Sequence, residues 1–167
     1  DIRKMHKLQE QYLFLARHNI HSAEELVGTI ASLTDKKKET SAEKSRIYKA
    51  RERSRELFTA ADEMENLKPA EQSYRLGDTF FEDEHRKWVA LEQELQAQGY
   101  SLEEVQALRR HYKEEYSEVC VKEKVVFREL NTGKAILNSM IPDSISDGRK
   151  TEYNREIIRD RKEQPVR

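Results

Sequence analysis

A regular apolar seam in residues 102–130 constrains the fold most strongly. Its members alternate at spacings of three and four: Leu102, Val105, Arg109, Tyr112, Tyr116, Val119, Glu123, Val126 and Leu130. This spacing places them on one face of an α-helix over about four heptads, with Arg109 and Glu123 as polar interruptions. The segment "NTGK" at 131–134 is expected to bend the helix, and "IPDSISDG" to end it.

The composition favours long helices with a narrow buried face. Charged residues make up 38% of the 167 residues, against about 25% in an average globular protein. Hydrophobic residues make up 36%, and there are five glycines and three prolines. We therefore predict an elongated all-α fold of three to five helices, arranged as antiparallel hairpins in a coiled-coil-like bundle.

Two helices are predicted before residue 67. Residues 2–17 place Ile2, Met5, Leu8, Tyr12 and Leu15 on one face, and Asn19 is a candidate left-handed cap. A second helix is expected as one element from about 22 to 66, because Ser22 and Glu25 form a capping box and neither Pro nor a helix-stopping Gly follows. Its second seam is Ile47, Ala50, Ser54, Leu57, Ala61 and Met64.

Two further helices are predicted after residue 68. Pro69 is expected to stand at the start of the third helix, because proline suits the first helical position. "LGD" at 76–78 should kink that helix, with Asp78 capping the helical segment after the kink, and Gly99 should end it. "SLEE" at 101–104 repeats the capping pattern of "SAEE" at 22–25. The predicted core is Leu8, Tyr12, Leu15, Leu57, Trp88, Leu91, Leu95, Tyr116, Val119 and Val126.

The stretch 34–46 has helical character but contains one apolar side chain, Ala42. We predict that it extends past the helical core with its side chains mostly in solvent. Residues 34–56 carry nine Lys or Arg against five Asp or Glu. Two interpretations stay open: a solvated helix held by charge pairs, and a basic arm that follows a DNA backbone. The candidate contact residues are Lys36, Lys37, Lys38, Lys44, Arg46, Lys49, Arg51, Arg53 and Arg55.

No motif in the sequence predicts catalysis or a cofactor. The five histidines are dispersed, and His18 and His21 lack the further ligands of a zinc site. Phosphate-loop, Gly-x-Ser-x-Gly and His-Glu-x-x-His patterns do not occur. The single cysteine, Cys120, excludes a disulfide framework and is interpreted as a structural thiol. We therefore expect no enzyme activity, no metal and no small-molecule substrate.

The sequence also bears on location and extent. No apolar run reaches membrane-spanning length and no signal peptide is recognisable, so we expect a cytoplasmic protein without membrane contact. The first residue is Asp1, within a helical pattern, which we interpret as a fragment of a longer protein. Residues 1–141 are predicted to form the helical domain, and 142–167, which have little apolar content, a mobile tail.

Four phrases in this order resemble the helical region that follows the nuclease domain of relaxases. They are "LQEQYLFLARHNIHSAEEL", "FFEDEHRKWVALEQEL", "GYSLEEVQALRRHYKEEY" and "FRELNTGKAILNSM", spread over residues 2–140. Relaxases are the mobilization proteins of plasmids and conjugative transposons of Gram-positive gut bacteria. The family's activity is single-strand nicking at an origin of transfer by a tyrosine, with a metal held by a histidine cluster. That cluster is missing here, so no catalytic residue is carried over.

The resemblance implies a non-catalytic accessory domain of a protein that takes part in conjugation. Its role would be to support contacts with DNA or with proteins of the transfer machinery. The alternative is a structural coiled-coil module that oligomerises its parent protein without binding DNA.

Overall fold

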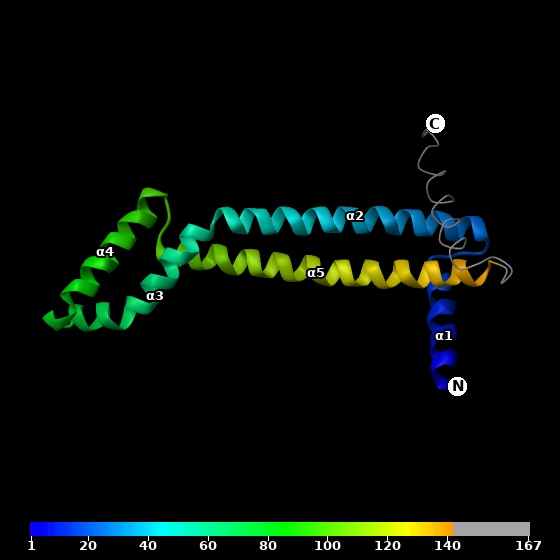
Figure 1. The fold of residues 1–167 in the computed structure, drawn as a ribbon, viewed down its shortest axis with the longest axis horizontal. Coiled ribbons are helices and arrows are strands. Elements are labelled where there is room, and N and C mark those ends of the chain that lie inside the picture. The colour runs from blue at the N-terminus through cyan, green and yellow to red at the C-terminus, as the bar shows by residue number, and fades with distance from the viewer. Residues whose placement is uncertain (142–167) are drawn as a thin grey trace, which may run out of the picture. The chain divides into compact units, whose positions relative to one another are not determined.

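The computed structural model describes residues 1–141, and these residues form helices joined by short turns (Figure 1). The α-helices are α1 (Ile2–Arg17), α2 (Ala23–Arg53), α3 (Arg55–Arg75), α4 (Glu82–Ala97) and α5 (Leu102–Ser139). A short 3-10 helix, η1 (Thr79–Phe81), precedes α4. Residues 1–141 contain no strand, so the predicted all-α class is confirmed. The tail predicted over 142–167 lies outside the described residues.

The predicted domain 1–141 contains two compact units. The terminal unit comprises residues 1–42 together with the described residues from 120 onward, and the central unit comprises Glu43–Val119. Each unit contains its own cluster of buried apolar side chains.

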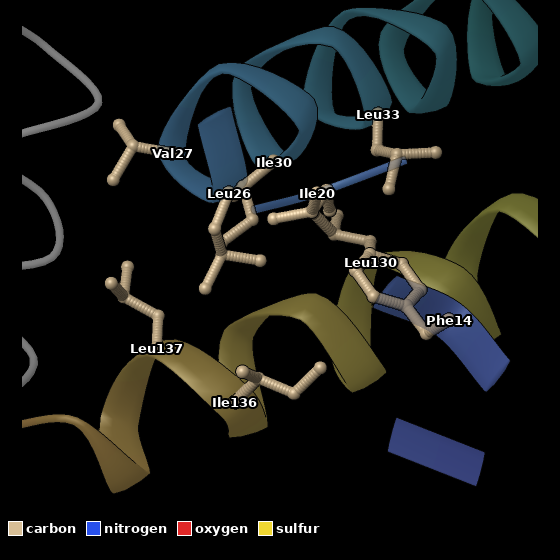
Figure 2. Close-up of a cluster of buried hydrophobic side chains, with 9 residues drawn as sticks. All are labelled: Phe14, Ile20, Leu26, Val27, Ile30, Leu33, Leu130, Ile136 and Leu137. Atoms are coloured by element: carbon tan, nitrogen blue, oxygen red, sulfur yellow. The ribbon is translucent and has the colours of Figure 1, made fainter. Parts of the chain in front are cut away.

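The terminal unit packs α1 across an antiparallel pair made by the first half of α2 and the second half of α5. Figure 2 shows its core, to which all three helices and the turn residue Ile20 contribute. The buried members are Phe14, Ile20, Leu26, Val27, Ile30, Leu33, Leu130, Ile136 and Leu137. The α2 members follow the spacing that a single buried face of a helix requires.

Gly133 allows a close approach of side chains in this core. A Cβ atom at Gly133 would lie 3.0 Å from Cζ of Phe14 and 3.1 Å from Cγ1 of Ile30. The segment 131–134, where a bend was predicted, does not interrupt α5, which continues to Ser139. The glycine makes room for the Phe14 ring inside an unbroken helix.

The central unit is built on the antiparallel pair of α3 and α4, against which the first half of α5 packs. Its cluster is Leu57, Phe58, Ala60, Ala61, Met64, Trp88, Leu95 and Val105. Tyr112 on α5 packs against this cluster, and its ring meets that of Phe58 edge to face with centroids 6.3 Å apart. Aromatic rings favour this geometry.

Most local signals for turns and caps are confirmed. At the box predicted for Ser22 and Glu25, the Ser22 hydroxyl accepts the Glu25 N–H, but the Glu25 carboxylate accepts the His21 N–H instead of that of Ser22. Asn19 has φ 51°, and Gly99 has φ 84°. The Ser101 hydroxyl accepts the Glu104 N–H at 3.2 Å while the Glu104 carboxylate accepts the Ser101 N–H, which is a complete capping box. Asp78 accepts the Phe80 N–H and begins η1. The expected kink at 76–78 is a full break between α3 and α4.

Two predicted boundaries are wrong. The single helix over 22–66 is interrupted at Ser54, whose N–H bonds to the Arg51 carbonyl and whose hydroxyl donates to the Ala50 carbonyl. Pro69 does not begin a helix but lies inside α3. Since proline lacks an N–H, the helical bond to the Glu65 carbonyl is missing there.

The predicted core was wrong on α1. Leu8 and Tyr12 are exposed, Tyr12 at 71%, whereas Phe14 is fully buried. Within residues 1–141, the buried side of α1 is therefore the one that carries Phe14, and not the one that carries Leu8 and Tyr12. Leu57, Trp88, Leu95 and Val119 are buried as predicted, and four positions are partly buried: Leu15, Leu91, Tyr116 and Val126.

The polar stretch 34–46 was expected to run past the core, which is wrong. Its side chains were expected to lie mostly in solvent, which is confirmed, since eight of the thirteen are exposed. Thr40 is only 7% exposed, and its hydroxyl donates to the Lys36 carbonyl. In the terminal unit, the Ser41 hydroxyl lies 3.4 Å from the Glu123 carboxylate on α5. The helix therefore packs through a polar seam that a count of apolar residues does not reveal.

Candidate nucleic-acid interface

The nine predicted contact residues divide into two groups. Lys37 and Lys44 are half-buried. The other seven side chains are exposed: Lys36, Lys38, Arg46, Lys49, Arg51, Arg53 and Arg55. The last five of these lie in the central unit, on the end of α2 and the start of α3, within ten residues of one another.

The two half-buried lysines lie against aromatic rings. In the terminal unit, Nζ of Lys37 lies 4.9 Å from the centroid of the Phe127 ring. In the central unit, Nζ of Lys44 lies 5.8 Å from the centroid of the Tyr116 ring. A lysine stem covers apolar surface while its ammonium group is attracted by the ring face. These two lysines therefore contribute to packing between helices as well as to surface charge.

A groove lies across the break between α2 and α3, within the central unit. Its volume is about 750 Å³. The lining residues are Tyr48, Arg51, Glu52, Arg55, Phe58, Thr59, Asp62, Arg109 and Lys113. The first seven recur at helical spacing through the end of α2 and the start of α3, and together they form one wall of the groove. Arg109 and Lys113 on α5 form the other wall.

Arg109 is fixed on one side of this groove by Asp62. Its two terminal nitrogens donate to the two carboxylate oxygens at 2.5 and 2.9 Å, which is bidentate pairing. The hydrogen bond from Arg109 lowers the pKa of Asp62, more than burial raises it, and Coulomb attraction adds to the lowering. The guanidinium also lies over the Phe58 ring, 5.2 Å from its centroid. The charge of Arg109 is thus largely matched.

Three further cations of the groove are not matched in this way. Arg51, Arg55 and Lys113 form no ion pair with any carboxylate of residues 1–141. Tyr48 stands beside them and is 52% exposed. The groove therefore combines unneutralised positive charge with an accessible aromatic ring.

Each unit also contains a carboxylate held by an arginine and a histidine. In the terminal unit, Glu129 accepts from Arg17 at 2.6 Å and from His18 at 2.7 Å. In the central unit, Glu71 accepts from Arg75 at 2.9 Å and from Nδ1 of His85 at 2.7 Å. The histidine nitrogens donate here because an ionised carboxylate only accepts.

Both carboxyl groups have pKa values below the ordinary range. Burial raises the pKa of Glu71, but hydrogen bonds from His85 and Arg75 outweigh it. Burial likewise raises the pKa of Glu129, and the bonds from His18 and Arg17 outweigh it. An aromatic ring lies beside each histidine: Phe14 at 4.5 Å from His18 and Tyr74 at 4.1 Å from His85, between ring centroids.

Residues 1–141 contain no group of three metal-binding side chains that could hold an ion. Within the same residues, no helix is both long and apolar enough to cross a bilayer. Comparison of the chain with protein families, curated proteins and solved structures found no match.

Several residues of the groove were not predicted from the sequence. Arg51 and Arg55 were candidates, but Tyr48, Asp62 and Lys113 were not. A usable signal was present, since Tyr48, Arg51 and Arg55 follow one another at helical spacing. The pairing of Arg109 with Asp62, 47 residues earlier, has no local sequence signal.

Proposed function

We propose that this chain is a non-catalytic, cytoplasmic accessory domain of a relaxase-like DNA mobilization protein. It contacts the phosphate backbone of nucleic acid through the basic residues at the end of α2 and the start of α3. The four phrases that resemble relaxases support the family, and the distribution of charge supports the contact. Contacts with proteins of the transfer machinery belong to the same proposal.

One observation carries the proposed contact with nucleic acid. Five cations lie within ten residues and are exposed: Arg46, Lys49, Arg51, Arg53 and Arg55. Within residues 1–141, none of them forms an ion pair. Such cations gain free energy by releasing the counterions condensed on nucleic acid, which makes binding depend steeply on salt.

The test compares two double variants that each remove two positive charges. Arg46→Ala/Lys49→Ala changes the proposed contact, whereas Arg86→Ala/Lys87→Ala changes cations on α4. Fluorescence anisotropy with a labelled oligonucleotide at several salt concentrations gives the affinity and its salt slope. We expect the first variant to bind more weakly and its slope to flatten by about 1 to 2, at roughly 0.7–0.9 per lost phosphate contact. Equal slopes for the two variants, or no binding by the parent, would contradict the proposal.

A second candidate function, oligomerisation of the parent protein, is favoured by the outer face of α1. Ile2, Met5, Leu8 and Tyr12 are all exposed on this helix, at spacings of three and four. Apolar residues in that pattern form the seam of coiled-coil contacts. Sedimentation equilibrium of the unmutated chain and of its variant Met5→Glu/Leu8→Glu tests this candidate. A mass that rises with concentration in the unmutated chain alone supports oligomerisation, and a monomeric unmutated chain excludes it.

A further inference from the structure

We infer that the groove across the α2–α3 break binds single-stranded nucleic acid, with phosphates on Arg51, Arg55 and Lys113 and a base stacked on Tyr48. This inference rests on the proposed function and assigns one substrate class and one site to it. All the residues involved belong to the central unit.

The charge of the groove selects a polyanion. Four cations and two carboxylates line it, and one carboxylate, Asp62, is already bound to Arg109. Three cations, Arg51, Arg55 and Lys113, then remain against one carboxylate, Glu52. The three cations come from both walls of the groove. Cations on two sides of a groove track a strand that runs between them.

The exposed tyrosine favours a single strand over a duplex. Tyr48 is half in solvent and lies on the same wall as Arg51 and Arg55. Bases of a single strand can leave their neighbours and stack on such a ring, whereas bases of a duplex are stacked and paired inside it.

Asp62 sets how strongly the groove attracts phosphate. Its carboxylate holds both terminal nitrogens of Arg109, so this guanidinium is not available to a ligand. Removing that carboxylate charge frees a fourth cation for the strand. Asp62→Asn should therefore tighten binding and steepen its salt dependence.

The test measures affinity for a single strand and for the duplex of the same sequence and length. The groove variant Arg51→Ala/Arg55→Ala/Lys113→Ala is compared with Arg46→Ala/Lys49→Ala/Arg53→Ala, which removes the same charge from outside the groove. We expect the parent to prefer the single strand. The groove variant should lose that preference, while the other triple variant should weaken both ligands by a similar factor and keep it.

Uncharged variants separate stacking from charge. Tyr48→Ala should weaken single-strand binding roughly five- to a hundredfold, whereas Tyr48→Phe, which keeps the ring, should bind like the parent. Circular dichroism confirms that each variant is folded, and Asp62→Asn gives a readout by gain of affinity.

If the groove variant keeps the single-strand preference, or Tyr48→Ala binds like the parent, the groove is not the site, although the proposed backbone contact can still hold. If the parent binds neither ligand, the proposed function itself fails.

Discussion

The terminal and central units contain the same trio, a glutamate with an arginine and a histidine, in different surroundings. The side chain of Glu129 in the terminal unit is 19% exposed, whereas that of Glu71 in the central unit is 4% exposed. Glu129 joins residues over 110 positions apart in the chain, while Glu71 joins a neighbour on its own helix to the next helix. In the terminal unit the paired glutamate thus links distant parts of the chain. In the central unit it occupies a buried position between two successive α-helices.

The two units also differ in their main aromatic anchor. Phe14 is an apolar ring that is fully enclosed beside Gly133. Trp88 is buried as well, but within residues 1–141 its Nε1 has no hydrogen-bond partner. A buried donor without a partner costs roughly 1–3 kcal/mol, so the central unit gains less from its anchor than the area of the ring implies.

Truncation of the anchors should have the largest effect. Phe14→Ala and Trp88→Ala should each lower the free energy of unfolding by about 3–5 kcal/mol, because each leaves a cavity. Tyr12→Ala on the exposed side of α1 is the matched control and should change it by less than about 0.5 kcal/mol. Urea titration followed by circular dichroism measures all three. A costly Tyr12→Ala would mean that the exposed face of α1 is covered in solution.

Removal of the buried carboxylate charge should come next. Glu71→Gln should cost about 1.5–3 kcal/mol at neutral pH, because the bonds to His85 and Arg75 lose their charge assistance. Glu129→Gln should cost less, because its carboxylate is closer to solvent. Chemical denaturation of the two variants side by side checks the order, and a larger loss for Glu129→Gln would reverse the comparison.

Acid should destabilise the parent through the same two groups. The pKa values of Glu71 and Glu129 are lowered in the folded protein, so the unfolded chain binds more protons as pH falls below about 4.5. The stabilisation is present above that pH and is lost as pH falls through the folded pKa values. Glu71→Gln should show a flatter decline than the parent in melting experiments from about pH 6 to about pH 3. Identical slopes would show that Glu71 titrates normally.

The smallest effect is expected for Trp88→Phe. The change loses ring volume but also removes an N–H that has no partner within residues 1–141. These terms oppose each other, so we expect a net change within about 1 kcal/mol. Thermal melting beside Trp88→Ala provides the measurement. A loss as large as that of Trp88→Ala would indicate that Nε1 is satisfied in solution.

Sequence alone predicted the parts of the fold that are governed by neighbouring residues. The caps at Ser101 and Asp78 and the left-handed residues Asn19 and Gly99 need only a few adjacent side chains. The break at Ser54 and the position of Pro69 inside α3 were missed, because packing of the whole central unit outweighs local preference there. The face of α1 was misassigned because packing in the terminal unit, which encloses Phe14, decides which side of this helix is covered.

The candidate site was predicted in part. The nine candidate cations of α2 and the start of α3 follow from a count of charges, and seven of them are exposed. Their convergence into a groove depends on Arg109 and Lys113, which come from a helix far later in the chain than α2. Lys37 was predicted to lie in solvent, but its ammonium group lies over the Phe127 ring of α5.

Gly133 has a consequence for how α5 is aligned along its partners in the terminal unit. A seam with spacings of three and four looks nearly the same after a shift of seven residues, so the seam alone leaves several alignments close in energy. After such a shift, Phe14 would meet Val126 or Met140 in place of Gly133. Either side chain would occupy the space where the ring now lies. The missing side chain at Gly133 therefore selects one alignment of α5 against α1 from several similar ones.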